Sequence, residues 1–173
     1  MRGETVFGAR GEAVEDVGAW LSRLQEVSAA LCLGAQALDA EAVCGREHAV
    51  SALLHASRAH AAGRGLARTL GTEWALCVAG VRQVGVALER VGVRKGTATF
   101  AIMLSFEGDA MPPEEAVAAF LRGTGLERDD SVLAPKEGAL RRLGVGDAEL
   151  RAVPRERWTE LALERVALLD LER

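Results

Sequence analysis

Two short segments in the middle of the chain carry residues that could bind an anion. The sequence at 63–65 is Gly-Arg-Gly and Arg68 follows, so a helix beginning here would place free backbone N–H groups below an arginine. Such N–H groups bind phosphate, although glycines at a corner between two helices need no ligand. Arg82 and Gln83 stand at the next expected helix start and offer further donors. The candidate anion-binding residues are Gly63 and Gly65, and the candidate donors are Arg64, Arg68, Arg82 and Gln83.

The three histidines could suggest a metal centre, but their spacing argues against it. His48 and His55 are seven residues apart on one expected helix, so about 10 Å of rise separates them, too far to hold one ion. His60 points in another direction on the same helix. We expect no metal site and add His48 to the candidate ligand contacts, with a histidine that packs or caps the helix as the alternative.

Residue patterns that activate a nucleophile or bind a nucleotide are absent. The chain contains no GxSxG, SxxK or Walker motif and no GxGxxG after a strand. The adjacent carboxylates Glu114-Glu115 and Asp129-Asp130 fall at an expected helix start and turn. Three widely spaced cysteines form no CxxC pair and are expected to be reduced and buried. We therefore expect neither catalytic activity nor a cofactor.

Charge is unevenly distributed along the sequence. Residues 46–96 carry eight cations and three acids, a net charge of +5 within a chain of net charge −4. Almost all of these cations are arginines, which suit forked contacts with phosphate. If they share one surface, that surface would attract a polyanion; the alternative is a set of solvated helix faces. Glu73 lies among apolar residues and is expected to be partly buried and paired with Arg82, unless Arg82 serves a ligand.

The elements that must position these residues indicate an α/β fold in one domain, residues 1–173. Apolar residues make up 49% of the chain but aromatics only 4%, so we expect mostly helices packed through small side chains, around three or four strands. Strands are expected at 5–9, 27–38 (where a helix is also possible) and 97–106, and a turn at Gly108 and Met111-Pro112-Pro113. Helices are expected at 12–24, 46–62, 66–78 with a bend near Gly71, 82–91, from Pro113 to 123, 136–143 and 156–169, with a loop at 126–135.

The longest uncharged run, residues 27–38, has twelve residues, whereas a membrane-spanning helix needs about 20. The first residues include early acids and no apolar core of a secretion signal. We expect a cytoplasmic protein with no membrane partner.

Several motifs, taken in order, resemble those of a known family. They are Gly45-Arg46-Glu47-His48-Ala49, His55-Ala56, Arg68-Thr69-Leu70-Gly71-Thr72-Glu73, Ala79-Gly80-Val81-Arg82-Gln83-Val84 and the ending Leu163-Glu164-Arg165-Val166-Ala167-Leu168-Leu169-Asp170. This set is similar to the smallest tRNA-binding subunit of the KEOPS complex, the TPRKB-like family, in its archaeal type. The likeness extends from about residue 36 to the end and is strongest across 44–92.

The resemblance implies a single α/β domain without catalytic activity. Members of this family dock on the kinase-like ATPase subunit of KEOPS and bind the 3′ CCA end of tRNA. They thereby support threonylcarbamoylation of the adenosine beside the anticodon, while the transferase and ATPase subunits perform the chemistry. The likeness assigns RNA contacts to no single residue; from charge and position we choose Arg64, Arg68, Arg82, Gln83 and His48.

Two other functions stay open at this point. The chain could be a protein-only scaffold that regulates the ATPase subunit without touching RNA, its basic segment facing an acidic partner surface. It could also be a small enzyme acting on a phosphorylated metabolite at residues 63–68, although no nucleophile or base is evident there.

Overall fold

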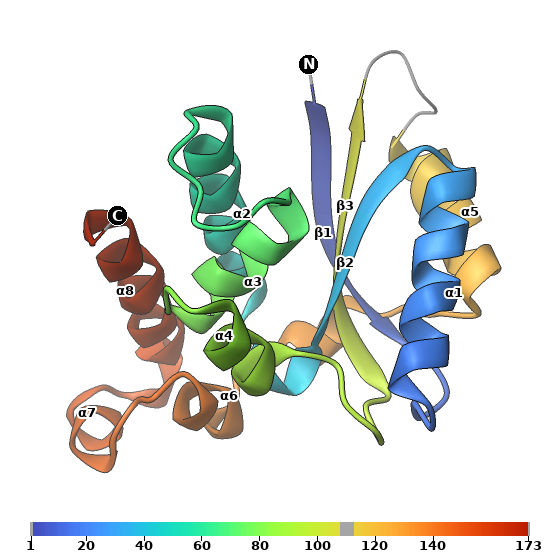
Figure 1. The fold of residues 1–173 in the computed structure, drawn as a ribbon. Coiled ribbons are helices and arrows are strands. Elements are labelled where there is room, and N and C mark those ends of the chain that lie inside the picture. The colour runs from blue at the N-terminus through green and yellow to red at the C-terminus, as the bar shows by residue number, and fades with distance from the viewer. Residues whose placement is uncertain (1, 108–112, 173) are drawn as a thin grey trace.

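The computed structural model describes residues 2–107 and 113–172 and confirms the expected α/β class, with most of the chain in helices around a small sheet (Figure 1). The sheet consists of β1 (Arg2–Arg10), β2 (Leu33–Asp39), β3 (Thr99–Glu107) and the two-residue β4 (Glu127–Arg128). The strand order is β2-β3-β1-β4 and all pairs are antiparallel. β3, rich in β-branched and aromatic residues as expected, lies near the centre, and β2 forms an edge. The turn expected at Gly108 and Met111-Pro112 lies outside the described residues.

The apolar run 27–38 is shared between two elements, so the strand expected there is correct only in its second half. Helix α1 (Val17–Ala30) contains the first four residues of the run. Cys32, with a φ of 53°, turns the chain between α1 and β2. At its other end α1 begins later than expected, because the Asp16 side chain accepts a hydrogen bond from the Ala19 N–H and caps the helix.

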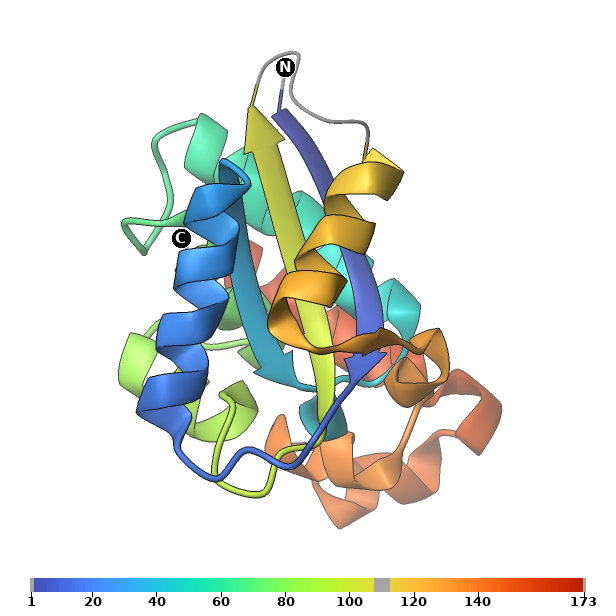
Figure 2. The ribbon, with the colours of Figure 1, turned by 90° about the vertical axis from the view of Figure 1, so that its right-hand side faces the viewer.

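One face of the sheet is covered by α1 and α5 (Pro113–Thr124), which lie side by side in front of the strands in Figure 2. Phe7, Ile102 and Phe120 are fully buried between the sheet and these helices. The Trp20 ring stacks on Phe100 at a centroid distance of 4.8 Å.

The other face is covered by a thicker layer of α2 (Arg46–Ala61), α3 (Leu70–Ala79) and α8 (Trp158–Leu171). Buried alanines along α2 allow close approach of its neighbours, and the indole N–H of Trp74 donates to the Ala49 carbonyl oxygen at 3.0 Å. α3 ends at Gly80, which has a φ of 62° and lies so close to Arg165 that an added Cβ would be 2.8 Å from the Arg165 Cβ.

Shorter elements complete this layer. They are α4 (Val84–Val91), α6 (Glu137–Arg142), α7 (Asp147–Ala152) and 3-10 helices at Ala40–Ala42, Asp130–Leu133 and Arg155–Arg157. The segment 126–135, expected to be a loop, thus contains β4 and a 3-10 turn. The Asp129 carboxylate caps that turn by accepting a hydrogen bond from the Ser131 N–H at 3.0 Å. This cap explains why a polar segment forms a regular 3-10 helix.

Candidate ligand-binding site

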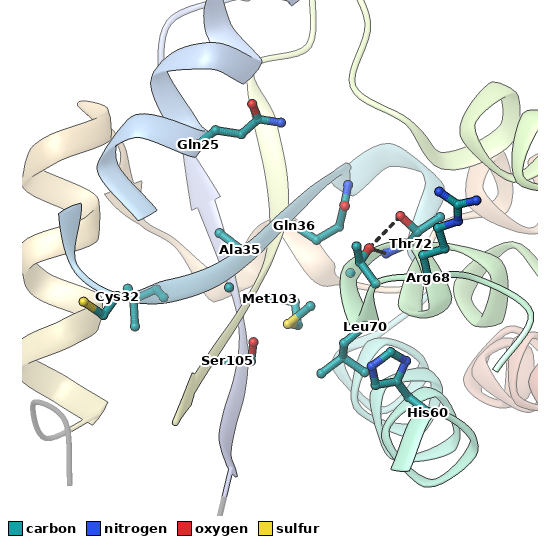
Figure 3. A pocket seen from close by; sticks show the side chains of 14 residues that line it. Gln25, Cys32, Ala35, Gln36, His60, Arg68, Leu70, Thr72, Met103 and Ser105 are labelled. Atoms are coloured by element: carbon teal, nitrogen blue, oxygen red, sulfur yellow. Dashed lines mark hydrogen bonds between the residues drawn. The ribbon is translucent and has the colours of Figure 1, made fainter. Parts of the chain in front are cut away.

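A hollow of about 800 Å³ opens between the edge strand β2 and the N-terminal end of α3. In the view of Figure 3, Arg68 and Thr72 stand on one side, Gln25 and Cys32 on the other, and Met103 lies between them. The lining residues are Gln25, Cys32, Leu33, Gly34, Ala35, Gln36, His60, Arg68, Thr69, Leu70, Gly71, Thr72, Met103 and Ser105.

Small residues create this hollow. At Gly71 the first turn of α3 meets β2 so closely that an added Cβ would be 3.0 Å from the Gln36 Cβ. Farther along β2, Gly34 lies opposite Ser105 of β3, and a Cβ at Gly34 would be 2.4 Å from the Ser105 hydroxyl oxygen. α3 is therefore in contact with one part of β2, while the sheet beside Gly34 and Ser105 remains open.

The polar groups around the hollow are donors, such as the Arg68 guanidinium, and amide, hydroxyl and imidazole groups that both donate and accept hydrogen bonds. The Thr69 hydroxyl caps α3 by accepting from the Thr72 N–H at 3.2 Å, and the first-turn amides of a helix have no intrahelical partner. The positive end of the helix dipole adds to the exposed guanidinium of Arg68 at the same place. His60 and Ser105 line the wall as well. This arrangement suits an anionic ligand with several acceptor atoms.

The structure corrects the prediction for Gly63 and Gly65. No helix begins there; α3 begins at Leu70, because Thr69 provides the cap. The segment instead bends around the carboxylate of Glu73, which is fully buried. The Ala67 N–H donates to Glu73 Oε2 at 2.7 Å, and a Cβ at Gly65 would be 3.2 Å from the same oxygen. The group that Gly65 approaches is thus the side chain of Glu73, a residue of the chain itself. The expected pairing of Glu73 with Arg82 stays a prediction.

His48 is also corrected as an RNA contact, because its side chain is fully buried. The Cys44 N–H donates to Nδ1 at 3.2 Å, which leaves the Nε2–H to donate to the Val78 carbonyl oxygen at 3.1 Å. Burial lowers the pKa of His48 to about 4, and the hydrogen bond to Val78 opposes this shift only in part. His48 is a neutral side chain that joins the start of α2 to the end of α3.

The remaining candidates are exposed but do not gather at one place. Arg64 and Arg68 lie on the segment before α3, whereas Arg82 and Gln83 follow its other end, and a ten-residue helix is about 15 Å long. Of these four, Arg68 lines the large hollow.

The cations of residues 46–96 that line hollows are distributed over three of them. Other cations of residues 46–96 lie beside two further hollows: Arg46 and Arg58 beside one on α2, and Arg90 and Arg94 beside one at the end of α4. The segment forms three helices and the links between them, a division that a linear charge count does not reveal.

Several lining residues were not predicted from the sequence, notably Gln36, His60 and Ser105. Gln36 and Ser105 belong to strands whose pairing was not predictable. The α3 start had a usable signal: a Thr-x-x-Thr pattern at Thr69 and Thr72 directly before an apolar run is typical of a capped helix start.

A second feature of this layer is apolar surface on α2 and α8. Leu54 of α2 is 57% exposed, and Leu168 and Leu171 of α8 are 47% and 82% exposed. The two helices pack together, and His55 Nδ1 lies 3.0 Å from Asp170 Oδ2 where they meet. Leu163 and Leu54 both line one hollow.

Within the described ranges 2–107 and 113–172, no group of three or more His, Cys, Asp or Glu side chains could hold a metal ion. No helix in this part of the chain is long and apolar enough to cross a membrane.

A family model described as kinase binding protein CGI-121 matches residues 14–145, more than half of the chain. The match includes the large hollow and helices α2 to α4 and ends before α8. A search of curated proteins gave no match. The TPRKB-like assignment made from the motifs is confirmed, and the chain belongs to the CGI-121 family of kinase binding proteins.

Proposed function

We propose that this chain is a non-catalytic subunit of a cytoplasmic KEOPS complex that binds both the kinase-like ATPase subunit and the 3′ CCA end of tRNA. In this role it supports threonylcarbamoylation of tRNA, which the ATPase and transferase subunits carry out. The observation that carries the RNA part is the hollow of about 800 Å³ in which Arg68 and the N-terminal end of α3 face the open edge of the sheet. Membership in a kinase binding family supports the ATPase partner.

The hollow suits the chemistry of a single-stranded RNA end. Such an end presents phosphates together with unstacked bases whose edges are free to form hydrogen bonds. Arg68 and the first-turn amides of α3 are donors for phosphate, while Gln25, Gln36 and Ser105 offer amide and hydroxyl groups for base edges. The large aromatic side chains that usually stack bases do not line the hollow, so Arg68 and His60 are the flat groups available for stacking.

Binding of tRNA with and without its 3′ CCA tests this proposal. The variant Arg68→Glu should weaken binding of intact tRNA by at least about tenfold, since it replaces a charge-assisted contact by repulsion. Arg122→Glu is a matched control, because Arg122 is an exposed arginine of α5 on the opposite side of the sheet. Equal affinity for tRNA lacking CCA, or equal losses in the two variants, would refute the placement of RNA in this hollow.

The kinase-like subunit is proposed to dock on the exposed leucines of α2 and α8. Leu54, Leu168 and Leu171 expose apolar surface, which is a feature of interaction sites, and burying one leucine side chain contributes about 1.5–3 kcal/mol. Leu168→Arg and Leu171→Arg should each weaken co-purification with the ATPase subunit by at least about tenfold. Leu88→Arg is the matched control, because Leu88 is an equally exposed leucine (46%) on α4. Loss of binding in the control and retention in the α8 variants would move the interface to α4.

A protein-only scaffold remains the second candidate, and the dispersal of the arginines over three places favours it. It predicts normal association with the ATPase subunit and no salt-sensitive tRNA binding by the chain. An enzyme acting at residues 63–68 has less support, because that segment encloses the Glu73 carboxylate.

A further inference from the structure

The hollow at the end of α4, mentioned above, has a volume of about 390 Å³ and lies between α4 and the end of α6. Three arginines from distant parts of the sequence border it: Arg90 and Arg94 from the end of α4 and the residues after it, and Arg142 from α6. Val86 and Glu89 complete the lining. The proposed RNA and kinase contacts use none of these residues, so the cluster has no role in the functions discussed above.

Contacts behind the hollow hold the three guanidinium groups in place. Arg142 Nη1 donates to Oδ2 of the buried Asp39 at 2.6 Å, and Arg94 Nε lies 3.8 Å from the same oxygen. Arg94 Nη2 donates to the Glu89 carbonyl oxygen at 3.1 Å. Arg90 Nη1 donates to the carbonyl oxygen at the end of α3, that of Ala79, at 3.4 Å.

These contacts leave donors for a ligand. A guanidinium group has five N–H donors, and the contacts just described engage one or two on each arginine. Groups that are already positioned lose little conformational freedom on binding, which favours affinity.

The charge of the cluster is positive even with its carboxylates counted. Asp39 and Glu89 together oppose three guanidinium groups, and Asp39 is the buried partner that anchors Arg142. Three forked donors around one concave site match a group with three terminal oxygens better than a carboxylate, which has two. A phosphate monoester presents three such oxygens.

We infer that the hollow between Arg90, Arg94 and Arg142 binds a phosphate monoester group. Such a group is carried by a small phosphorylated molecule or by the 5′ end of an RNA. This proposal does not rest on RNA binding at Arg68. Arg68 lies before the N-terminal end of α3, whereas Arg90 contacts the C-terminal end of that helix.

The test measures binding of inorganic phosphate and pyrophosphate to the full chain by calorimetry, and maps the site by amide NMR shifts. Saturable binding at low salt is expected, with shifts at residues 86–94 and near Arg142. Arg90→Gln and Arg94→Gln should each weaken it by at least about tenfold. Arg142 is left unchanged, because its loss would leave the buried Asp39 without its closest arginine.

Two controls make the result decisive. Arg122→Gln, on α5, should bind phosphate as the wild type does, and thermal unfolding should show that each variant is folded. If either glutamine variant unfolds, Arg90→Lys and Arg94→Lys keep the charge but lose the fork, and should bind more weakly than the wild type. Absence of saturable binding by the wild type, or undiminished binding by the Arg90 and Arg94 variants, would overturn the inference.

A competition experiment identifies the source of the phosphate. A 5′-phosphorylated oligouridine that displaces pyrophosphate, while its 5′-hydroxyl counterpart does not, points to an RNA end. Failure of both oligonucleotides to displace it points to a small phosphorylated molecule, and equal displacement by both would contradict the preference for a monoester. Arg68→Glu should leave pyrophosphate binding unchanged, so failure of the proposed RNA site and failure of this site give different results.

Discussion

Acidification should destabilise this protein through His48, and the size of the effect follows from burial. The pKa of His48 lies near 4 in the folded chain against 6.5 for an ordinary histidine. The unfolded chain therefore binds a proton that the folded chain excludes, and stability falls as pH drops from about 6.5 toward 4. Linkage predicts that the free energy of unfolding falls by about 2 kcal/mol between pH 7.5 and pH 5 because of this one group.

Urea unfolding at a series of pH values, with the wild type and His48→Gln, measures this contribution. A glutamine at 48 does not titrate. The free energy of unfolding of the variant should therefore fall by about 2 kcal/mol less than that of the wild type over the same pH interval. At pH 7.5 the variant should itself be less stable by about 1–3 kcal/mol, because the hydrogen bonds with Cys44 and Val78 are disturbed.

The comparison isolates His48 from the other titrating groups. Asp129, Glu149 and Glu160 have lowered pKa values, for which hydrogen bonds to Ser131, Gly146 and Arg157 respectively are the largest causes, so their titration moves away from that of a histidine. His60→Gln is the matched control, because His60 is only partly buried at the large hollow. An identical pH slope in the wild type and His48→Gln would refute the reasoning.

Three further perturbations test the layer that carries the hollows. Glu73→Ala should lower the free energy of unfolding by about 1.5–3 kcal/mol and speed exchange of the loop amide it binds, as hydrogen exchange would show. Gly80→Ala should cost about 1–3 kcal/mol in urea unfolding, because the residue has a positive φ and its Cβ would meet Arg165; an unchanged midpoint would argue against this packing. In maleimide labelling of the native chain, Cys32 should react quickly because it is exposed, whereas Cys44 should not, because burial raises the pKa of its thiol.

Local patterns predicted the elements that depend on local chemistry. β3 is an uncharged run with β-branched and aromatic residues and no glycine or proline up to Phe106, and α2 carries a stripe of buried alanines; both formed close to where the patterns placed them. The run 27–38 misled because its apolar residues serve first a helix end and then an edge strand, and the residue that separates them, Cys32, adopts a positive φ without being glycine. No periodicity marks that kind of boundary.

The candidate site was less predictable, because it depends on which strands pair and on what a buried carboxylate contacts. Gln36 and Ser105 line the same hollow only because the β2–β3 register places Gln36 opposite Met103 and Gly34 opposite Ser105. Gly65 looked suited to a phosphate, and its neighbourhood does enclose an anion, but that anion comes from Glu73 eight residues later. His48 stands beside the alanine stripe of α2, and its sequence position alone does not tell a ligand contact from a buried link between helices.

The arrangement of the layers places the proposed contacts on different sides of one helical layer. α2 packs against both α3 and α8, and Figure 1 shows α8 and the edge strand β2 on opposite sides of the pair formed by α2 and α3. A kinase-like partner seated on the leucines of α8 would therefore leave the hollow between α3 and β2 open. His48 and the loop around Glu73 connect α2 to the two ends of α3, so the surfaces rest on a shared rigid support. Such a support suits a subunit that contributes no reacting group and acts by holding one macromolecule in a defined position relative to another.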